Sequence, residues 1–200
     1  MRSVMLDSVR IIAGTFRRRT LEAPPGLATR PTSDRLRETL FNVLAPRIEG
    51  ANFLDLYAGS GAVGMEALSR GATHATFVEQ SPRAVKVLRE NLEKLGLTAG
   101  FRLHPSAVRA FFRKAGSDAK HPAAFDLVFL DPPYDAAEEY ATTLGLLGGA
   151  TRLLANDALV IAEHRKKQSL ESSYGSLKQT RLLEQGDAAL SFYSPAREDG

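Results

Sequence analysis

The stretch from Phe53 to Gly71, FLDLYAGSGAVGMEALSRG, constrains the fold more than any other part of the chain. It is typical of an apolar strand, a tight glycine turn and the start of an amphipathic helix. Gly59, Gly61 and Gly64 match the spacing GxGxxG, which in an α/β protein marks close approach of the backbone to a nucleotide-like ligand. Asp55 precedes Gly59 by four residues, where its carboxylate would repel the pyrophosphate of a dinucleotide. The turn therefore predicts a nucleoside ligand without phosphates.

S-adenosylmethionine is a nucleoside of this kind, and its ammonium and sulfonium cations match an acidic, glycine-rich pocket. The second predicted strand ends in Glu79, twenty residues after Gly59, the distance expected for a carboxylate that accepts hydrogen bonds from ribose hydroxyls. The third strand runs into His104-Pro105-Ser106-Ala107. Ser106 there can meet an adenine or simply cap the next helix.

Strands and helices alternate from residue 52 onward. Strands are predicted over 52–57, 75–79, 101–104, 125–130 and 159–163, and helices follow the first four of them, one from about Pro82 to Leu95. Such alternation predicts an α/β fold with a parallel, doubly wound sheet. Segments near 177–183 and 189–193 flank a turn and predict an antiparallel hairpin that closes one edge.

The N-terminal quarter is basic. It holds nine arginines and five acidic residues through residue 50, a net charge of +4, whereas the whole chain carries +3. Strands over Arg10–Phe16 and Arg19–Glu22 predict a hairpin around Arg17, Arg18 and Arg19. Such a cluster is either a solvated edge or a contact for a phosphate backbone. We predict a basic extension over 1–31, a main domain over 32–194 and a frayed tail over 195–200.

Length and composition suit one globular domain. The 200 residues are 44% hydrophobic and 24% charged, with no run long enough to span a bilayer and no signal-peptide core. We therefore expect a cytoplasmic protein that acts as a monomer. The absence of cysteine excludes disulfides, thiolate metal sites and a cysteine nucleophile. The four histidines form no ligand pattern, so no metal site is predicted.

The fourth strand ends in Asp131-Pro132-Pro133-Tyr134, the most specific chemistry in the chain. Two successive prolines carry no N–H and have a fixed φ, so the loop presents carbonyl oxygens rigidly. If the Asp131 carboxylate and the Pro132 carbonyl accept the two hydrogens of an exocyclic amine, its lone pair can point at a methyl sulfonium. Tyr134 supplies a face on which an extruded base can stack, worth about 1 to 3 kcal/mol. The loop predicts amine methylation, although a simple turn is the alternative.

Together these motifs resemble a class I S-adenosylmethionine-dependent amino-methyltransferase. The N-terminal run RIIAGTFRRRTLEAPPGLATRPTSDRLRETLFNVL, with LDLYAGSGAVGMEALSRG, FVEQ and FLDPPY, resembles the RsmD-type family of bacterial small-subunit (16S) rRNA guanine-N2 methyltransferases. The likeness extends from Arg10 to about Tyr193.

The resemblance implies a seven-stranded Rossmann-like sheet with an antiparallel last strand, an N-terminal hairpin for RNA, and 16S rRNA in a pre-assembled ribosomal particle as substrate. It implies a target-amine clamp at Asp131, Pro132, Pro133 and Tyr134. We expect cofactor contacts at Asp55, Tyr57, Gly59, Ser60, Gly61, Glu79, Gln80, Ser106, Ala107, Asp131 and Thr32. We expect RNA contacts at Arg10, Arg17, Arg18, Arg19, Arg30 and Arg35. Ser106 departs from the acidic residue that such enzymes often place near the adenine.

Several alternatives stay open at this point. A nicotinamide-dependent dehydrogenase would explain the glycine turn and Glu79, but neither Asp55 nor the proline loop. A DNA adenine-N6 methyltransferase would share the site, yet 200 residues leave little room for a target-recognition insertion. A C5-pyrimidine methyltransferase is excluded because it needs a cysteine. A non-catalytic rRNA-binding assembly factor would bind RNA without methyl transfer.

Overall fold

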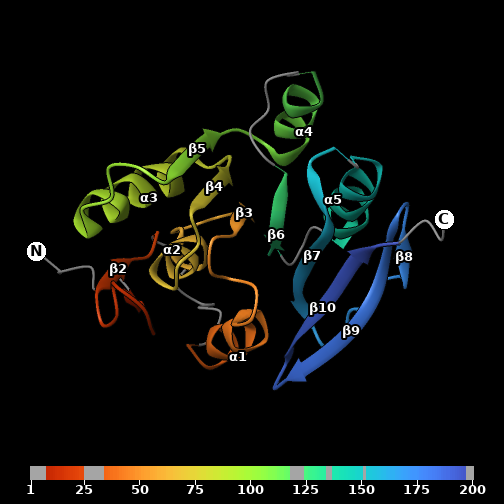
Figure 1. Cartoon of the computed structure of the whole chain (residues 1–200), viewed down its shortest axis with the longest axis horizontal. Coiled ribbons are helices and arrows are strands. Elements are labelled where there is room, and N and C mark those ends of the chain that lie inside the picture. The colour runs from red at the N-terminus through yellow and green to blue at the C-terminus, as the bar shows by residue number, and fades with distance from the viewer. Residues whose placement is uncertain (1–7, 25–33, 118–123, 134–136, 151, 197–200) are drawn as a thin grey trace, which may run out of the picture.

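The computed structural model describes residues 8–24, 34–117, 124–133, 137–150 and 152–196 (Figure 1). Five helices and ten strands occur in these ranges. In chain order they are β1 (Ser8–Arg10), β2 (Thr20–Glu22), α1 (Asp34–Leu44), β3 (Asn52–Leu56), α2 (Ala62–Ser69), β4 (His74–Glu79), α3 (Pro82–Leu95), β5 (Phe101–Pro105), α4 (Val108–Ser117), β6 (Phe125–Leu130), α5 (Ala137–Gly149), β7 (Leu154–Arg165), β8 (Ser173–Tyr174), β9 (Leu177–Gln185) and β10 (Ala188–Pro195).

The main sheet has the strand order β5-β4-β3-β6-β7-β10-β9-β8. The first five strands in this order are parallel, which confirms the predicted doubly wound sheet. The last strand, β10, lies antiparallel between β7 and β9, as predicted. The two-residue strand β8 adds an eighth, outermost strand to the seven predicted ones. The chain leaves β3 toward β4 and β5 and returns on the other side to β6, so the topological switch point lies between β3 and β6.

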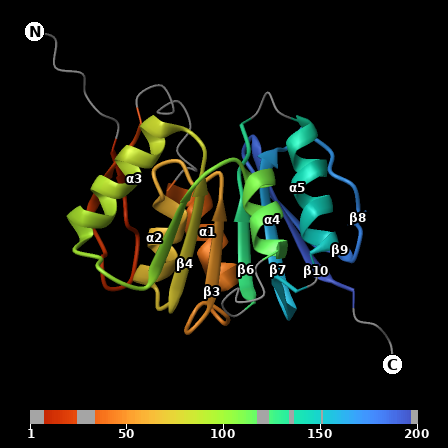
Figure 2. The same ribbon diagram turned by 90° about the horizontal axis from the view of Figure 1, so that it is seen from above.

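Helices cover both faces of the sheet. In Figure 2, α4 and α5 lie in front of the sheet. There they enclose one core with the side chains of β3 and β6 that point toward them, namely Leu54, Leu56, Val128 and Leu130. The helices α1, α2 and α3 enclose the second core on the opposite face together with residues of the N-terminal hairpin. Within the described ranges, no helix is long and apolar enough to span a bilayer.

The N-terminal hairpin is shorter than predicted. Its strands pair only over Ser8–Arg10 and Thr20–Glu22, so the strand expected over Arg10–Phe16 is wrong beyond Arg10. The physical reason is a competing set of hydrogen bonds. The N–H groups of Ile12 and Ala13 donate to the buried carboxylate of Glu66 on α2, at 2.7 and 3.0 Å, instead of to a partner strand. This segment is therefore a loop docked on α2 (Figure 1).

Candidate active site

The carboxyl ends of β3 and β6 form the centre of the candidate site. Leu56 of β3 pairs with Leu130 of β6, so the residues that follow, Tyr57 and Asp131, leave neighbouring strands at the same edge. In doubly wound sheets, ligands bind outside the carboxyl ends of the strands at the switch point. The structure thus brings together the glycine turn and the Asp131 loop, which are about seventy residues apart in the sequence.

The glycine turn has the conformation that its sequence demands. Gly59 and Gly61 have φ values of 55° and 79°, in the left-handed region that favours glycine. At Gly64, a Cβ would lie 2.3 Å from the ring of Phe77 on β4, so only glycine lets α2 pack this closely on the sheet. The Gly64 N–H donates to the Asp55 carboxylate at 2.9 Å. Gly59 and Ser60 stay partly exposed at the edge.

Asp55 lies beneath the turn rather than in its mouth. Its side chain is fully buried, and burial raises its pKa from 3.8 to about 8, opposed by the hydrogen bond from Gly64 and reinforced by the negative charge of Glu79. By accepting from the Gly64 N–H, the Asp55 side chain stabilises the first turn of α2. Its predicted contact with a bound cation stays a prediction.

This pKa predicts how the stability of the ligand-free protein depends on pH. Between pH 4 and 8 the unfolded chain loses the Asp55 proton while the folded protein keeps it. The free energy of unfolding should therefore fall as pH rises, by at most about 1.4 kcal/mol per pH unit from this group, and level off above pH 8. Urea unfolding at several pH values measures it. Asp55→Asn should flatten the profile, and an equally steep profile in that variant would contradict the assignment.

Glu79 links the glycine turn that follows β3 to the turn that follows β4. Its carboxylate accepts hydrogen bonds from the Gly59 N–H at 2.9 Å and from the Ser81 N–H at 2.7 Å. A carboxylate has about four acceptor positions, so two remain for a ligand's hydroxyl groups. The next residue, Gln80, is exposed beside it.

Ser106 and Ala107 follow β5 at the same edge. Ser106 is partly buried and its N–H donates to the His104 carbonyl at 2.9 Å, whereas Ala107 is exposed. Both lie in the connection to α4, and Ser106 also lines a surface pocket beside that helix. The predicted adenine contact at these two residues stays a prediction.

The proline loop begins directly after β6. Asp131 is partly buried, Pro132 is buried and Pro133 is exposed. The loop therefore starts at the sheet and emerges at the surface beside the glycine turn. Tyr134 lies outside the described residues, as do Arg30 and Thr32.

Tyr57 links the glycine turn to α5. Its φ of 61° is unusual for a residue other than glycine, and it directs the side chain toward the helix that follows the proline loop. The hydroxyl donates to Glu139 Oε2 at 2.8 Å and lies 2.6 Å from Thr143 Oγ1. Since its one proton goes to Glu139, the Thr143 hydroxyl is left to donate to Tyr57. Burial raises the pKa of Tyr57, so the phenol stays protonated as a donor.

The predicted basic residues are spread over different parts of the molecule. Arg17 and Arg18 are in the turn of the N-terminal hairpin, and the Arg19 guanidinium donates to the Lys94 carbonyl at the end of α3. The side chain of Arg10 lies 3.8 Å from the Asp34 carboxylate, and Arg35 is exposed on α1. The turn of the hairpin docks at Ser69, where α2 ends, while the glycine turn lies where α2 begins. The structure therefore does not bring Arg17, Arg18 and Arg19 to the carboxyl ends of β3 and β6, where the candidate site lies.

Asn91 is a site residue that sequence reasoning missed. Its side-chain amide is fully buried on α3, donates to the Ser60 carbonyl at 3.0 Å, and exchanges two hydrogen bonds with the backbone of Glu22 on β2. It thus ties the hairpin to the glycine turn. A sequence signal existed, because Asn91 interrupts the apolar face that Ala84, Leu88 and Leu95 form on this helix.

The strand order, the inserted antiparallel strand and the glycine turn beside Asp131 are those of the class I S-adenosylmethionine-dependent methyltransferases. A family model described as conserved hypothetical protein 95 matches residues 9–194. Ribosomal RNA small subunit methyltransferase D of Escherichia coli (strain K12) is 40% identical over 164 residues, which cover 81% of this chain and 77% of that protein. The chain therefore belongs to the family that includes ribosomal RNA small subunit methyltransferase D, as its motifs predict.

Two further similarities agree with this assignment. Ribosomal RNA small subunit methyltransferase D of Haemophilus influenzae is 38% identical over 164 residues, or 81% of each chain. The solved structure of yhhF from Escherichia coli matches with a TM-score of 0.80 at 34% identity, covering 94% of this chain and 98% of that one.

Proposed function

We propose that this protein transfers a methyl group from S-adenosylmethionine to the exocyclic N2 of a guanine in 16S rRNA. The observation that carries the proposal is the adjacency of the glycine turn after β3 and the Asp131-Pro132-Pro133 loop after β6. One holds the donor and the other the acceptor amine. The small-subunit rRNA methyltransferases among its relatives support the substrate class.

The residues at this edge fit the donor. A bound S-adenosylmethionine presents ribose hydroxyls and an ammonium group, which are hydrogen-bond donors, and the edge offers the Glu79 carboxylate and exposed turn backbone as acceptors. We assign the ribose to Glu79 and the methionine side to the turn from Tyr57 to Gly61. The donor supplies an activated methyl group when bound. Among the described residues, no three histidine, aspartate or glutamate side chains are grouped as metal ligands would be.

In the proposed reaction, Asp131 and the Pro132 carbonyl orient the target amine. Each accepts one amine hydrogen, which moves the nitrogen toward tetrahedral geometry and frees its lone pair. The nitrogen–carbon bond forms as the carbon–sulfur bond breaks, which leaves S-adenosylhomocysteine, and the methylated amine then releases one proton to solvent. Proximity and the negative charge of Asp131 provide most of the rate enhancement. Tyr134 stacks on the flipped guanine.

We further propose that the enzyme acts as a cytoplasmic monomer on a small ribosomal subunit or an assembly intermediate. In this scheme, residues 1–31 extend the catalytic domain of residues 32–194 toward RNA. The tail predicted over 195–200 is shorter than expected, because Pro195 belongs to β10 and pairs with Leu177. Arg30 and Arg35 are the proposed RNA contacts closest in sequence to α1, and the side chain of Arg10, another proposed contact, lies 3.8 Å from the carboxylate of Asp34 at the start of this helix.

The decisive experiment supplies labelled S-adenosylmethionine and small subunits from a strain that lacks the homologous enzyme. Nucleoside analysis of the 16S rRNA should then show N2-methylguanosine. N6-methyladenosine would overturn the assigned substrate. RNA binding without any methyl transfer would instead indicate a non-catalytic assembly factor.

Tyr57→Phe tests the link between the donor turn and α5. Removal of both hydroxyl interactions should lower kcat by about tenfold, because the donor turn is no longer held against the helix that follows the acceptor loop. Binding of S-adenosylhomocysteine should change little. The matched control is Tyr174→Phe, whose hydroxyl accepts only from the Glu171 N–H among the described hydrogen bonds. Equal turnover in the two variants would contradict the positioning role.

A further inference from the structure

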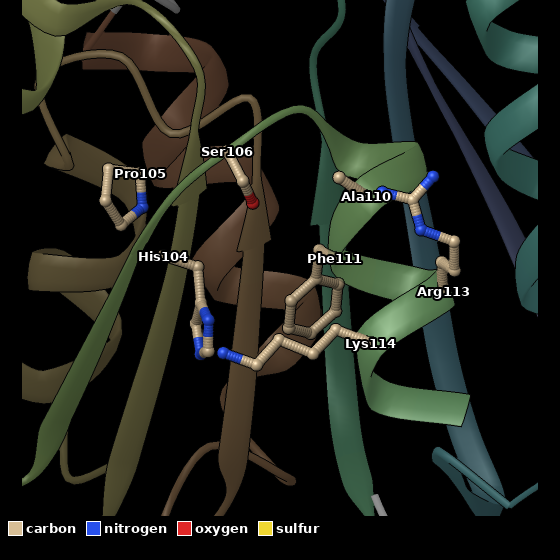
Figure 3. A pocket seen from close by; sticks show the side chains of 7 residues that line it. All are labelled: His104, Pro105, Ser106, Ala110, Phe111, Arg113 and Lys114. Carbon is tan, nitrogen blue, oxygen red and sulfur yellow. The ribbon is translucent and has the colours of Figure 1, made fainter. Parts of the chain in front are cut away.

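A pocket lies between β5 and α4, beside the candidate active site. It has a volume of about 430 Å³, and its walls include His104, Ser106, Phe111, Arg113 and Lys114. Figure 3 shows the Lys114 side chain extending from α4 toward the His104 ring, with Ser106 at the carboxyl end of the strand. The His104 and Phe111 rings meet edge to face at 5.1 Å, so the floor of the pocket is a fixed aromatic pair.

The lining of this pocket favours an anion. None of its lining residues is acidic, and two of them, Arg113 and Lys114, are exposed cations. The whole of α4, VRAFFRKAGS, contains three basic residues and no acidic one. By contrast, α3 offsets part of its positive charge with Glu90 and Glu93. A basic, open pocket with a serine hydroxyl suits a phosphate group, whereas it would repel the ammonium and sulfonium of the methyl donor.

The position of the pocket connects it to the site. Ser106 leaves β5 at the carboxyl edge, where the donor is proposed to bind. Arg109 lies one helical turn before Arg113, about 6 Å along α4, and donates to Thr142 of α5 at 3.0 Å. The next residue, Thr143, contacts Tyr57 of the glycine turn. The basic face of α4 therefore begins beside the donor turn and continues into the pocket.

We propose that this pocket binds a backbone phosphate of the RNA substrate, with Arg113 and Lys114 as its cationic ligands. The inference rests on the proposed function for the identity of the RNA. It also differs from the sequence prediction, which assigned RNA contacts to Arg17, Arg18 and Arg19. Those arginines lie by the far end of α2, whereas α4 begins at the catalytic edge.

The test measures binding of wild-type and variant enzyme to small ribosomal subunits at several salt concentrations, with S-adenosylhomocysteine present. The double variant Arg113→Ala/Lys114→Ala should bind more weakly, and the slope of log affinity against log salt should fall by about 0.7 to 0.9, the value for the loss of one phosphate interaction. Arg113→Lys should keep most of the slope. The control double variant Lys178→Ala/Arg181→Ala removes two exposed charges on β9, near the opposite edge of the sheet, and should bind like wild type.

An unchanged affinity and slope in the Arg113/Lys114 variant would overturn the phosphate site. So would calorimetry in which inorganic phosphate or ATP binds the wild-type pocket while RNA binding is unaffected by the substitutions, because the ligand would then be a free phosphate compound. The binding readout is independent of methyl transfer. A wild-type enzyme that binds RNA through α4 but transfers no methyl group would refute the proposed function and leave the phosphate site supported.

Discussion

Replacing Asp131 by alanine should lower kcat by about 10² or more while leaving the affinity for S-adenosylhomocysteine nearly intact. Asp131 follows β6 directly, and its neighbour in the adjacent strand is the start of the donor turn. Its proposed interaction is with the amine that becomes positively charged as the methyl group arrives. Loss of the carboxylate removes this interaction from the transition state, whereas the donor keeps its proposed contacts with Glu79 and the glycine turn, so its affinity should change little. Single-turnover methyl transfer to small subunits, with calorimetric binding of S-adenosylhomocysteine, measures both quantities.

Two further variants separate charge from shape at this position. Asp131→Asn keeps the size and one acceptor oxygen but loses the negative charge, so its kcat should lie between those of wild type and Asp131→Ala. The matched control is Asp126→Asn, a carboxylate near the amino end of the same strand that accepts from the Asn52 N–H at 2.8 Å. It should retain turnover. Full activity in Asp131→Ala would refute the assigned role.

The central sheet can be predicted because its strands are buried on both faces. Such strands are nearly continuous apolar runs, and the run Phe125–Leu130, interrupted only by Asp126, predicts a strand with the bounds that the structure has. The bounds of α3 can also be predicted, since both of its ends carry local signals. Ser81 caps the first turn by accepting from the Ala84 N–H, and Gly96 ends the helix with a φ of 74°.

The interactions that the sequence does not predict join segments distant along the chain. The apolar pattern of Ile11 and Ile12 is typical of a strand, but the N–H of Ile12 donates to Glu66, more than fifty residues away. Likewise, Tyr57 lies at the start of the glycine turn, yet its side chain is held by Glu139 and Thr143 of α5. Periodicity reports which face of an element is buried. It does not report which polar group on another element will meet an unpaired N–H.

Glu66 is the polar group that connects the N-terminal hairpin to α2. It is fully buried on α2 and accepts from Ile12, Ala13 and the Nε of Arg70, the last at 2.7 Å. The buried Arg37 lies 3.9 Å from its second oxygen. Burial lowers the pKa of Arg37, and the charges of Glu66 and Asp34 oppose that shift. One carboxylate thus lies beside two cations and accepts from two backbone donors, while Asp34 provides a second negative charge at Arg37.

Glu66→Ala should lower the free energy of unfolding by about 3 to 5 kcal/mol, because the buried Arg37 loses one of its two counter-charges, while Arg70 and two backbone N–H groups lose their acceptor. Denaturant unfolding measures this loss, and trypsin cleavage after Arg17, Arg18 or Arg19 should accelerate as the hairpin detaches. Glu90→Gln removes an exposed carboxylate 3.8 Å from Lys86 and should change stability by less than about 0.5 kcal/mol. If Glu66→Ala does not fold, Ser69→Ala gives a milder test, since it removes the hydroxyl that accepts from Phe16 and donates to the Ala13 carbonyl. Wild-type stability and cleavage in both variants would show that the hairpin is held by its apolar contacts, Ile11 and Leu21, rather than by this polar network.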